Sequence, residues 1–271
     1  MYHLTGVTTY HRSGRDGAAV PMLDGVGLYV EDGGGLVVRG PAGSGTSALL
    51  RVLGGLERPT RGSVVLNGTD LAMVTECRLA RIRAESIGMV LGGSGRGSGG
   101  GGAGSAGLLG RSELWPGLTA RQNVASALLP LRLRPADCRE LAATTLEEVG
   151  LGSQLDCVPG ELDLGERRRV ALARALVKRP AVLLADRPTA GLSGAARAGI
   201  VELFARLWSE RRIDCIVATE DDDLARQAPR LATFSRGRVA SVVRQGGPRP
   251  AVGSGGGCVP TVEGVDDRGD E

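Results

Sequence analysis

The chain has 271 residues, of which 42% are hydrophobic and 23% charged, and it carries a formal net charge of +3 at pH 7. Such a chain folds as one large or two small globular domains, and its mild charge gives no reason to expect nucleic acid as a partner. No apolar run approaches the ~20 residues of a membrane-spanning helix, and we expect no signal peptide. The five cysteines form no Cys-x-x-Cys pair, which favours a reduced, cytosolic protein over a disulfide framework.

In the first ninety residues, short apolar runs alternate with turns, and a glycine-rich loop separates one strand from one helix. The two most N-terminal runs predict a pair of antiparallel strands. "GLVVRG" predicts a buried strand leading into the loop, and "TSALLRVLGGL" has the leucine spacing of a helix. The elements expected here are strands at 2–10, 22–30, 35–40, 61–71 (with a turn) and 86–91, and a helix from 46.

Residues 93–110 are rich in Gly and Ser, which predicts a flexible insertion, either a tolerated loop or one that docks a partner. Helical spacing follows to about 164, and apolar strands then alternate with helices, which predicts an α/β fold with a parallel sheet and an all-helical insertion. The elements expected are helices at 119–130, 135–149, 165–180 and 194–210, and strands at 181–186, 214–219 and within 230–243. The polar, Gly/Pro-rich residues from 246 on are expected to be disordered.

The segment "GPAGSGTS", Gly40 to Ser47, has the spacing of a phosphate-binding loop but lacks the lysine of the pattern G-x-x-x-x-G-K-[ST]. Thr46 occupies that position, and Lys178 is the only lysine of the chain, so no displaced lysine nearby replaces it. Backbone N–H groups and a helix N-terminus still make an anion site without the lysine. Taken alone, the segment is equally well explained as a glycine-rich turn between a strand and a helix.

Further motifs follow in a fixed order: "SIGMV", "LTARQNVASALLPL", "GERRRVALARALVKRPAVLLADRPTAGL" and "DCIVATEDDDLA". With the loop, they make the chain, over about residues 4 to 244, resemble the ATP-binding subunits of ABC transporters, most of all the macrolide-export and lipoprotein-release branch. The resemblance implies a P-loop NTPase fold: a RecA-like core with an antiparallel β subdomain and a helical subdomain. The expected division is 1–92 (antiparallel β subdomain and first half of the core), 93–110 (insertion), 111–165 (helical subdomain), 166–244 (second half of the core) and 245–271 (disordered tail).

The resemblance also implies ATP and Mg²⁺ as ligands and assigns positions to them. An aromatic residue would stack on adenine, the loop would hold the phosphates, a hydroxyl and a carboxylate would hold Mg²⁺, and a signature segment would face the nucleotide of a second subunit. The nucleotide-binding positions are Tyr10, Gly40, Pro41, Ala42, Gly43, Ser44, Gly45, Thr46, Ser47 and Ala48; the Mg²⁺ positions are Ser47 and Asp186; the signature is Leu162, Asp163, Leu164, Gly165 and Glu166.

The chain departs from the family pattern at the positions that carry the chemistry. Arg187 stands where the family has the glutamate that polarises water, and a guanidinium cannot accept a proton. Asp163 replaces a serine that donates to the γ-phosphate, and Leu164 replaces a glycine that allows close backbone approach. The remaining departures are Thr46 for the lysine, Gly92 for a glutamine, Ser193 for an aspartate and Glu220 for a histidine.

Since losing one such group typically lowers the rate about 10² to 10⁴-fold, we expect no appreciable ATP hydrolysis. The favoured interpretation is a pseudo-ATPase subunit that associates with a membrane permease, as a homodimer or heterodimer, in the cytoplasm at the inner face of the cell membrane. Two alternatives stay open. One is a slow ATPase with replacement groups, in which Arg187 takes over part of the lysine's role. The other is a scaffold or regulatory module that uses no nucleotide.

Overall fold

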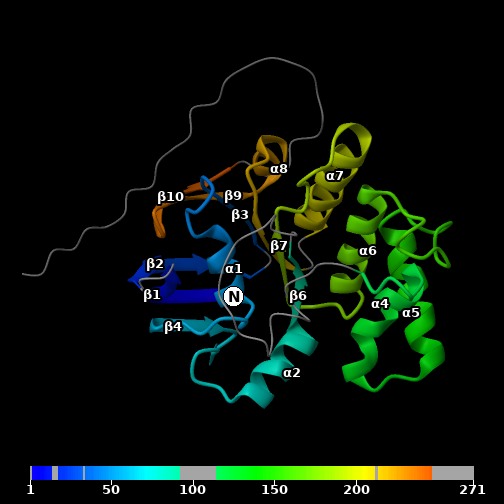
Figure 1. Cartoon of the computed structure of the whole chain (residues 1–271), viewed down its shortest axis with the longest axis horizontal. Helices are drawn as coiled ribbons and strands as arrows, with labels where there is room; N and C mark the ends of the chain where they lie inside the picture. The colour runs from blue at the N-terminus through cyan, green and yellow to red at the C-terminus, as the bar shows by residue number, and fades with distance from the viewer. Residues whose placement is uncertain (1, 14–17, 33, 92–113, 211–212, 246–271) are drawn as a thin grey trace, which may run out of the picture.

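The computed structural model describes residues 2–13, 18–32, 34–91, 114–210 and 213–245. Two β-sheets and a set of helices are arranged in layers (Figure 1). The predicted insertion at 93–110, the position Gly92 and the tail from 246 lie outside the described residues. The tail was expected from 245, but Gln245 belongs to the ordered fold, because its N–H donates to the carbonyl of Pro229 at 2.7 Å.

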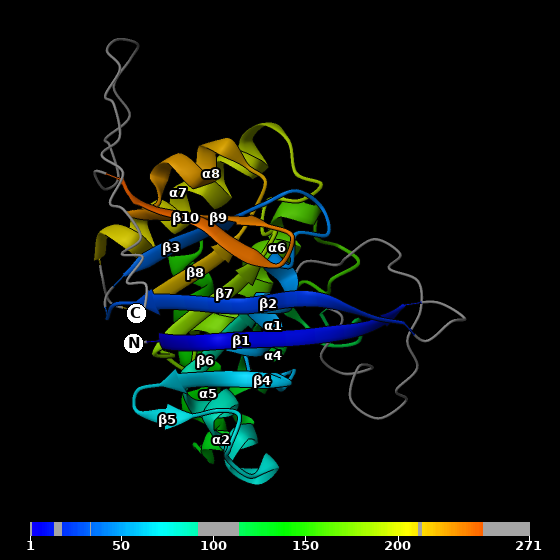
Figure 2. The ribbon, with the colours of Figure 1, turned by 90° about the vertical axis from the view of Figure 1, so that its left-hand side faces the viewer.

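The smaller sheet is antiparallel, with strand order β2-β1-β4-β5 (Figure 2). Its main pair joins the two N-terminal strands that were predicted to be antiparallel, each longer than the predicted run, and register shifts between Leu4 and Tyr10 mark irregular pairing along β1. The bounds of its strands are β1 Tyr2–Ser13, β2 Ala18–Val30, β4 Arg61–Leu66 and β5 Thr69–Asp70.

The larger sheet has six strands in the order β10-β9-β3-β8-β7-β6. Five run parallel, as the alternation of strands and helices predicted, and β10 pairs antiparallel with β9 at the edge. The central strands are short, and the apolar residues along them are buried because helices and the other sheet cover both faces. Their bounds are β3 Gly35–Arg39, β6 Ile87–Val90, β7 Val182–Asp186, β8 Asp214–Ala218, β9 Arg230–Ser235 and β10 Arg238–Arg244.

Alternate residues of the central strands enter two separate cores. In β3, Leu36 and Val38 pack with α1 (Thr46–Leu53) and the antiparallel sheet, whereas Val37 faces the opposite core. β7 divides in the same way, with Leu184 in the first core and Leu183 in the second. The six-stranded sheet is therefore the middle layer, which places the ends of its strands between two sets of covering elements.

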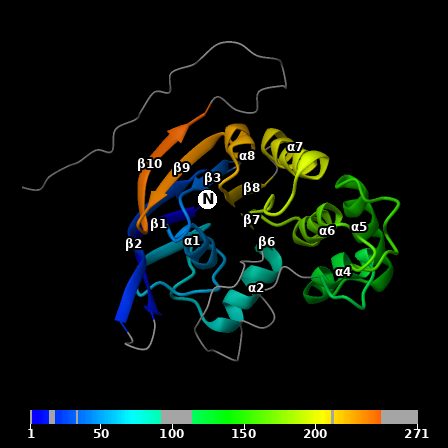
Figure 3. The ribbon, with the colours of Figure 1, turned by 45° about the horizontal axis from the view of Figure 1, so that its top comes forward.

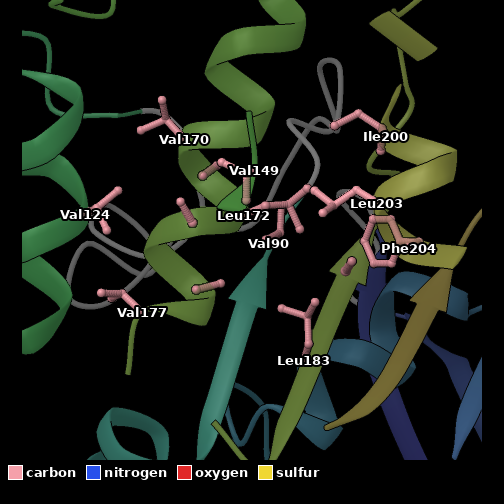
Figure 4. Close-up of a cluster of buried hydrophobic side chains, with 14 of the residues drawn as sticks. Val90, Val124, Val149, Val170, Leu172, Val177, Leu183, Ile200, Leu203 and Phe204 are labelled. Carbon is pink, nitrogen blue, oxygen red and sulfur yellow. The ribbon is translucent and has the colours of Figure 1, made fainter. Parts of the chain in front are cut away.

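The second core joins the sheet to the helical part, where Val90, Leu183, Leu172 and Phe204 converge (Figure 4). The helices α4, α5 and α6 lie together on the side away from β1 and β2 (Figure 3). Their bounds are α4 Ala120–Ala125, the 3₁₀ helix η1 Ser126–Leu131, α5 Pro135–Glu148 and α6 Leu164–Leu176, and α7 (Gly194–Glu210) covers the sheet beside them. The domain limits given above remain a prediction.

Four details of the expected secondary structure are wrong. The helix expected at 119–130 changes to 3₁₀ geometry after Ala125, in a stretch that holds Pro130, which has no N–H to donate. The helix expected to reach 180 ends at Leu176, before Pro180. Helix α2 (Glu76–Ser86) was missed because it buries only Leu79 and has no apolar stripe, and α8 (Asp222–Gln227) because it is short and acidic.

Candidate functional site

The glycine-rich loop connects β3 to α1 and presents the start of that helix without a side-chain cap. Gly45 is the N-cap residue with φ 100°, a left-handed conformation that favours glycine, and no side chain bonds the first turn. The first turn also contains no acidic residue. The N–H groups at this helix end and its partial positive charge are therefore available to an anion.

Close packing against neighbouring backbone sets the shape of this loop. A Cβ at Gly40 would lie 2.4 Å from the hydroxyl of Ser44, and a Cβ at Gly45 would lie 2.4 Å from the carbonyl of Met22. The Ser44 carbonyl accepts a 2.9 Å hydrogen bond from the N–H of Gly237, in the turn between β9 and β10. The loop is therefore held from two sides, and its two flanking glycines satisfy a steric requirement of this fold.

A buried carboxylate lies at the end of β7, next to the loop. Asp186 is 8% exposed, and burial raises its pKa, although a hydrogen bond from the Ser47 hydroxyl and the charge of Arg187 each offset part of that rise. Its Oδ1 atom has no hydrogen-bond partner among the described residues. A carboxylate oxygen without a partner beside a hydroxyl is a donor set that suits a hard divalent cation such as Mg²⁺. The residues present thus fit the metal that the resemblance implies.

Arg187, the next residue, is turned toward the end of the neighbouring strand β8. Its backbone is left-handed, with φ 47°, and its N–H donates to the carbonyl of Ala218 at 2.8 Å. Its guanidinium forms an ion pair with Glu220 at 2.5 Å between Nη2 and Oε1. The two residues at the positions that the resemblance assigns to a glutamate and a histidine therefore contact each other.

Glu220 begins an acidic segment, residues 220–223, which engages arginines from three other elements. Asp222 pairs with Arg39, the last residue of β3, at 2.6 Å. Asp221 accepts two hydrogen bonds from Arg197 of α7, and these lower the pKa of Asp221. The acidic segment thus pairs with arginines at the end of β3, directly after β7 and on α7. Sequence reasoning treated Glu220 only as a lost histidine; the four consecutive acidic residues after a buried strand were the signal available for this pairing.

The signature segment forms the N-terminus of α6, and its two carboxylates close that terminus. Asp163 Oδ1 accepts the N–H of Glu166 at 2.8 Å, and Glu166 Oε2 accepts the N–H of Asp163 at 2.9 Å, which makes a capping box. Leu162 is buried, Leu164 is 38% exposed, and Gly165 packs against α7, where a Cβ would lie 2.9 Å from that of Ala196. A helix end capped by two carboxylates does not favour a phosphate.

The structure places the other predicted residues as follows. Tyr10 of β1 is 44% exposed and pairs with Pro21, the residue before Met22, so it lies on the strand pair that borders the loop. Pro41, Ala42 and Gly43 are exposed on the loop, and Ala48 is buried below it. Ser193 is exposed just before α7, and Gly92 lies outside the described residues. The roles of these residues remain predictions.

Comparison with known proteins identifies relatives of this site and fold. A family model described as "ABC transporter" matches residues 23–95 and 104–190. The chain is 35% identical over 224 residues to the lipoprotein-releasing system ATP-binding protein LolD of Pseudomonas fluorescens, covering 83% of the chain and 91% of that protein. It is 36% identical over 251 residues to the macrolide export ATP-binding/permease protein MacB of Rhodopirellula baltica, covering 90% of the chain but 33% of MacB.

A solved structure shares the same fold. The ATP-binding cassette MJ0796, a dimer in a post-hydrolysis state bound to ADP and Pi, superimposes with a TM-score of 0.78 at 28% identity and covers 91% of the chain and 100% of that protein. This similarity confirms the predicted P-loop NTPase fold. Among the described residues, no helix is long and apolar enough to cross a membrane.

Proposed function

The chain belongs to the ATP-binding proteins of ABC transporters, and from this premise we propose that it is a pseudo-ATPase subunit that holds a nucleotide weakly and does not hydrolyse it. The observation that carries the proposal is the residue after Asp186. A general base at that place must accept a proton from water, whereas the guanidinium of Arg187 has donors and no acceptor and is paired with Glu220.

Two further features support the absence of turnover. Thr46 leaves the loop without the cation that would offset charge on the β- and γ-phosphates. The capping box of Asp163 and Glu166 holds two carboxylates at the N-terminus of α6, and we propose that this segment is the signature that would face a nucleotide of a second subunit. A subunit with this signature would therefore weaken a partner's site as well as its own, which argues against a pair in which it supports an intact motor subunit.

Binding is proposed to use the groups that remain. The backbone N–H groups at the start of α1 would hold phosphate oxygens, and the Ser47 hydroxyl with the Asp186 carboxylate would hold Mg²⁺. The ion would neutralise part of the phosphate charge when bound. Tyr10, exposed beside the loop, would supply an aromatic face for the base.

The proposed partners are a membrane permease and a second ATP-binding subunit. MacB joins an ATP-binding part to a permease part, and MJ0796 is dimeric. The chain spans about a third of the length of MacB and most of the length of LolD. A subunit with these partners would act at the inner face of the membrane.

The test is calorimetric titration of Mg-ATP into the purified chain, with phosphate release followed on the same sample. We expect binding without turnover. The Asp186→Asn protein, purified in parallel, is the control, since a contaminating ATPase would release phosphate equally from both preparations. Phosphate release by the wild type above that of Asp186→Asn would refute the pseudo-ATPase assignment. No binding by the wild type would refute nucleotide holding and favour a nucleotide-independent scaffold.

A further inference from the structure

The ends of β7 and β8 bring together two oppositely charged side chains at the candidate site. The strands are parallel neighbours, with Asp186 in register with Ala218 (Figure 3). Arg187 follows β7 directly, and its N–H binds the carbonyl of Ala218, so its place relative to β8 is fixed by the backbone. Glu220, 33 residues further along the chain, accepts the 2.5 Å hydrogen bond from its guanidinium.

This ion pair is open to solvent. The side chain of Arg187 is 41% exposed and that of Glu220 is 56% exposed. Ion pairs with such exposure are weak, because water solvates both partners and holding two long side chains together has an entropic cost. A ligand with several negative charges can therefore displace one carboxylate from the guanidinium, and a phosphate can bind a guanidinium through two parallel hydrogen bonds, whereas Glu220 accepts one.

Arg187 is also adjacent to the groups that would hold such a ligand. Its charge acts on the Asp186 carboxylate, which in turn binds the hydroxyl of Ser47 at the start of α1. The sole lysine, Lys178, is engaged elsewhere, since its Nζ donates to the carbonyl of Arg83 at 2.6 Å. Arg39, which directly precedes the loop, is paired with Asp222.

We propose that Glu220 is an internal competitor of nucleotide phosphate: its carboxylate occupies Arg187 in the unliganded protein, and the phosphates of a nucleotide displace it and take the guanidinium. This inference rests on the proposed nucleotide binding and extends it. It makes Arg187 a phosphate-binding residue and makes Glu220 the residue that sets how weak the binding is. The positions that the resemblance assigns to water activation thus tune affinity in this chain.

The acidic segment supplies a matched pair of variants for the test. Glu220→Gln and Asp222→Asn each remove one negative charge from neighbouring positions, and each breaks one ion pair with an arginine at a strand end. Only Glu220→Gln releases Arg187. A general change of electrostatic potential would change the affinity for Mg-ATP similarly in both variants. The release of Arg187 would raise that affinity in Glu220→Gln alone.

The experiment is titration of Mg-ATP into the wild type, Glu220→Gln, Asp222→Asn, Arg187→Gln and the double variant Arg187→Gln/Glu220→Gln. In Glu220→Gln the phosphate no longer has to break an exposed ion pair, whose strength corresponds to up to about fivefold tighter binding. We expect Asp222→Asn to stay within about twofold of the wild type, which is the scale of screened, exposed charges, and the double variant to lose the gain. Thermal unfolding without ligand checks that each variant is folded. If Arg187→Gln is not, Arg187→Asn replaces it, because it also removes the charge and asparagine tolerates the left-handed backbone at this position.

Each outcome decides a different statement. Equal effects of Glu220→Gln and Asp222→Asn, or a gain that survives in the double variant, would overturn the competition while leaving nucleotide binding intact. Absence of Mg-ATP binding in the wild type and in all variants would overturn the proposed nucleotide binding itself. Tighter binding confined to Glu220→Gln, and dependent on Arg187, would support both.

Discussion

Substituting Asp186, the buried carboxylate at the end of β7, should raise the stability of the unliganded protein and weaken its binding of Mg-ATP. Asp186 is 8% exposed and its Oδ1 lacks a partner among the described residues, and the net effect of its surroundings is to raise its pKa. The ionised form is therefore less favourable in the folded chain than in water. Asp186→Asn keeps the shape and removes the charge, so we expect the unliganded protein to become more stable at pH 7.

The size of the gain follows from the contacts. A buried polar group without a partner costs about 1–3 kcal/mol, and the Ser47 hydroxyl and the Arg187 charge offset part of it, which leaves about 1 kcal/mol. For a chain of this length that corresponds to about 2–4 °C in Tm. In the presence of Mg-ATP we expect the wild type to be more stable than Asp186→Asn. A ligand at 100 times its Kd stabilises the wild type by about 2.7 kcal/mol, whereas the variant has lost one Mg²⁺ ligand.

The pH dependence gives an independent check with a fixed sign. Since the folded-state pKa of Asp186 is raised above its ordinary value of 3.8, the folded chain holds the proton more tightly than the unfolded chain. This contribution to the free energy of unfolding is fully present below pH 3.8 and is lost as the pH rises through the folded-state pKa. In Asp186→Asn this decrease in the free energy of unfolding with rising pH should be absent.

The assay is thermal unfolding of the wild type and variant between pH 4 and 8 (about the usable range), with and without Mg-ATP. Asp156→Asn is the control, because it removes the same charge from a side chain that is 72% exposed. A variant that is less stable than the wild type without ligand at pH 7 would refute the reasoning, since it would mean that the carboxylate is well satisfied in the fold.

Three further predictions concern single side chains. Thr46→Lys restores a cation to the loop and should tighten Mg-ATP binding at least about tenfold by calorimetry, the effect of one charge-assisted hydrogen bond; unchanged affinity would show that the loop does not hold phosphate. Burial lowers the pKa of Lys178 to about 8, and since it is the only lysine, a protein labelled with ¹³C-lysine should show one lysine resonance with a titration midpoint near pH 8. The unfolded chain holds this proton up to the ordinary pKa of 10.5, so the free energy of unfolding should rise between pH 8 and 10.5. A midpoint near 10.5 would contradict the burial of Lys178. Asp163→Ala removes a helix cap and should cost about 1 kcal/mol in urea unfolding, whereas Asp163→Ser should keep most of that stability; equal losses would mean that the cap contributes nothing.

The sequence alone was enough for the features that depend on neighbouring residues. The run "GLVVRG" followed by glycines and a leucine-spaced helix predicted β3, the loop and α1, because strand and helix periodicities are local properties. The chemistry of the departures was equally readable: a threonine cannot supply the charge of a lysine, and Arg187 cannot accept a proton wherever the fold places it. The family resemblance supplied the fold class, which the structural comparison confirms.

Tertiary structure decided which of these groups meet. Glu220 pairs with Arg187 because the strand order places β8 beside β7. The two residues are 33 positions apart, and local sequence patterns do not predict the order of strands in a sheet. The partnerless oxygen of Asp186 likewise depends on the burial of this carboxylate at the end of β7. Residue types and spacing determine what each group is able to do, whereas long-range packing determines which group it pairs with. In a site of charged groups, that pairing determines whether a group is available to a ligand.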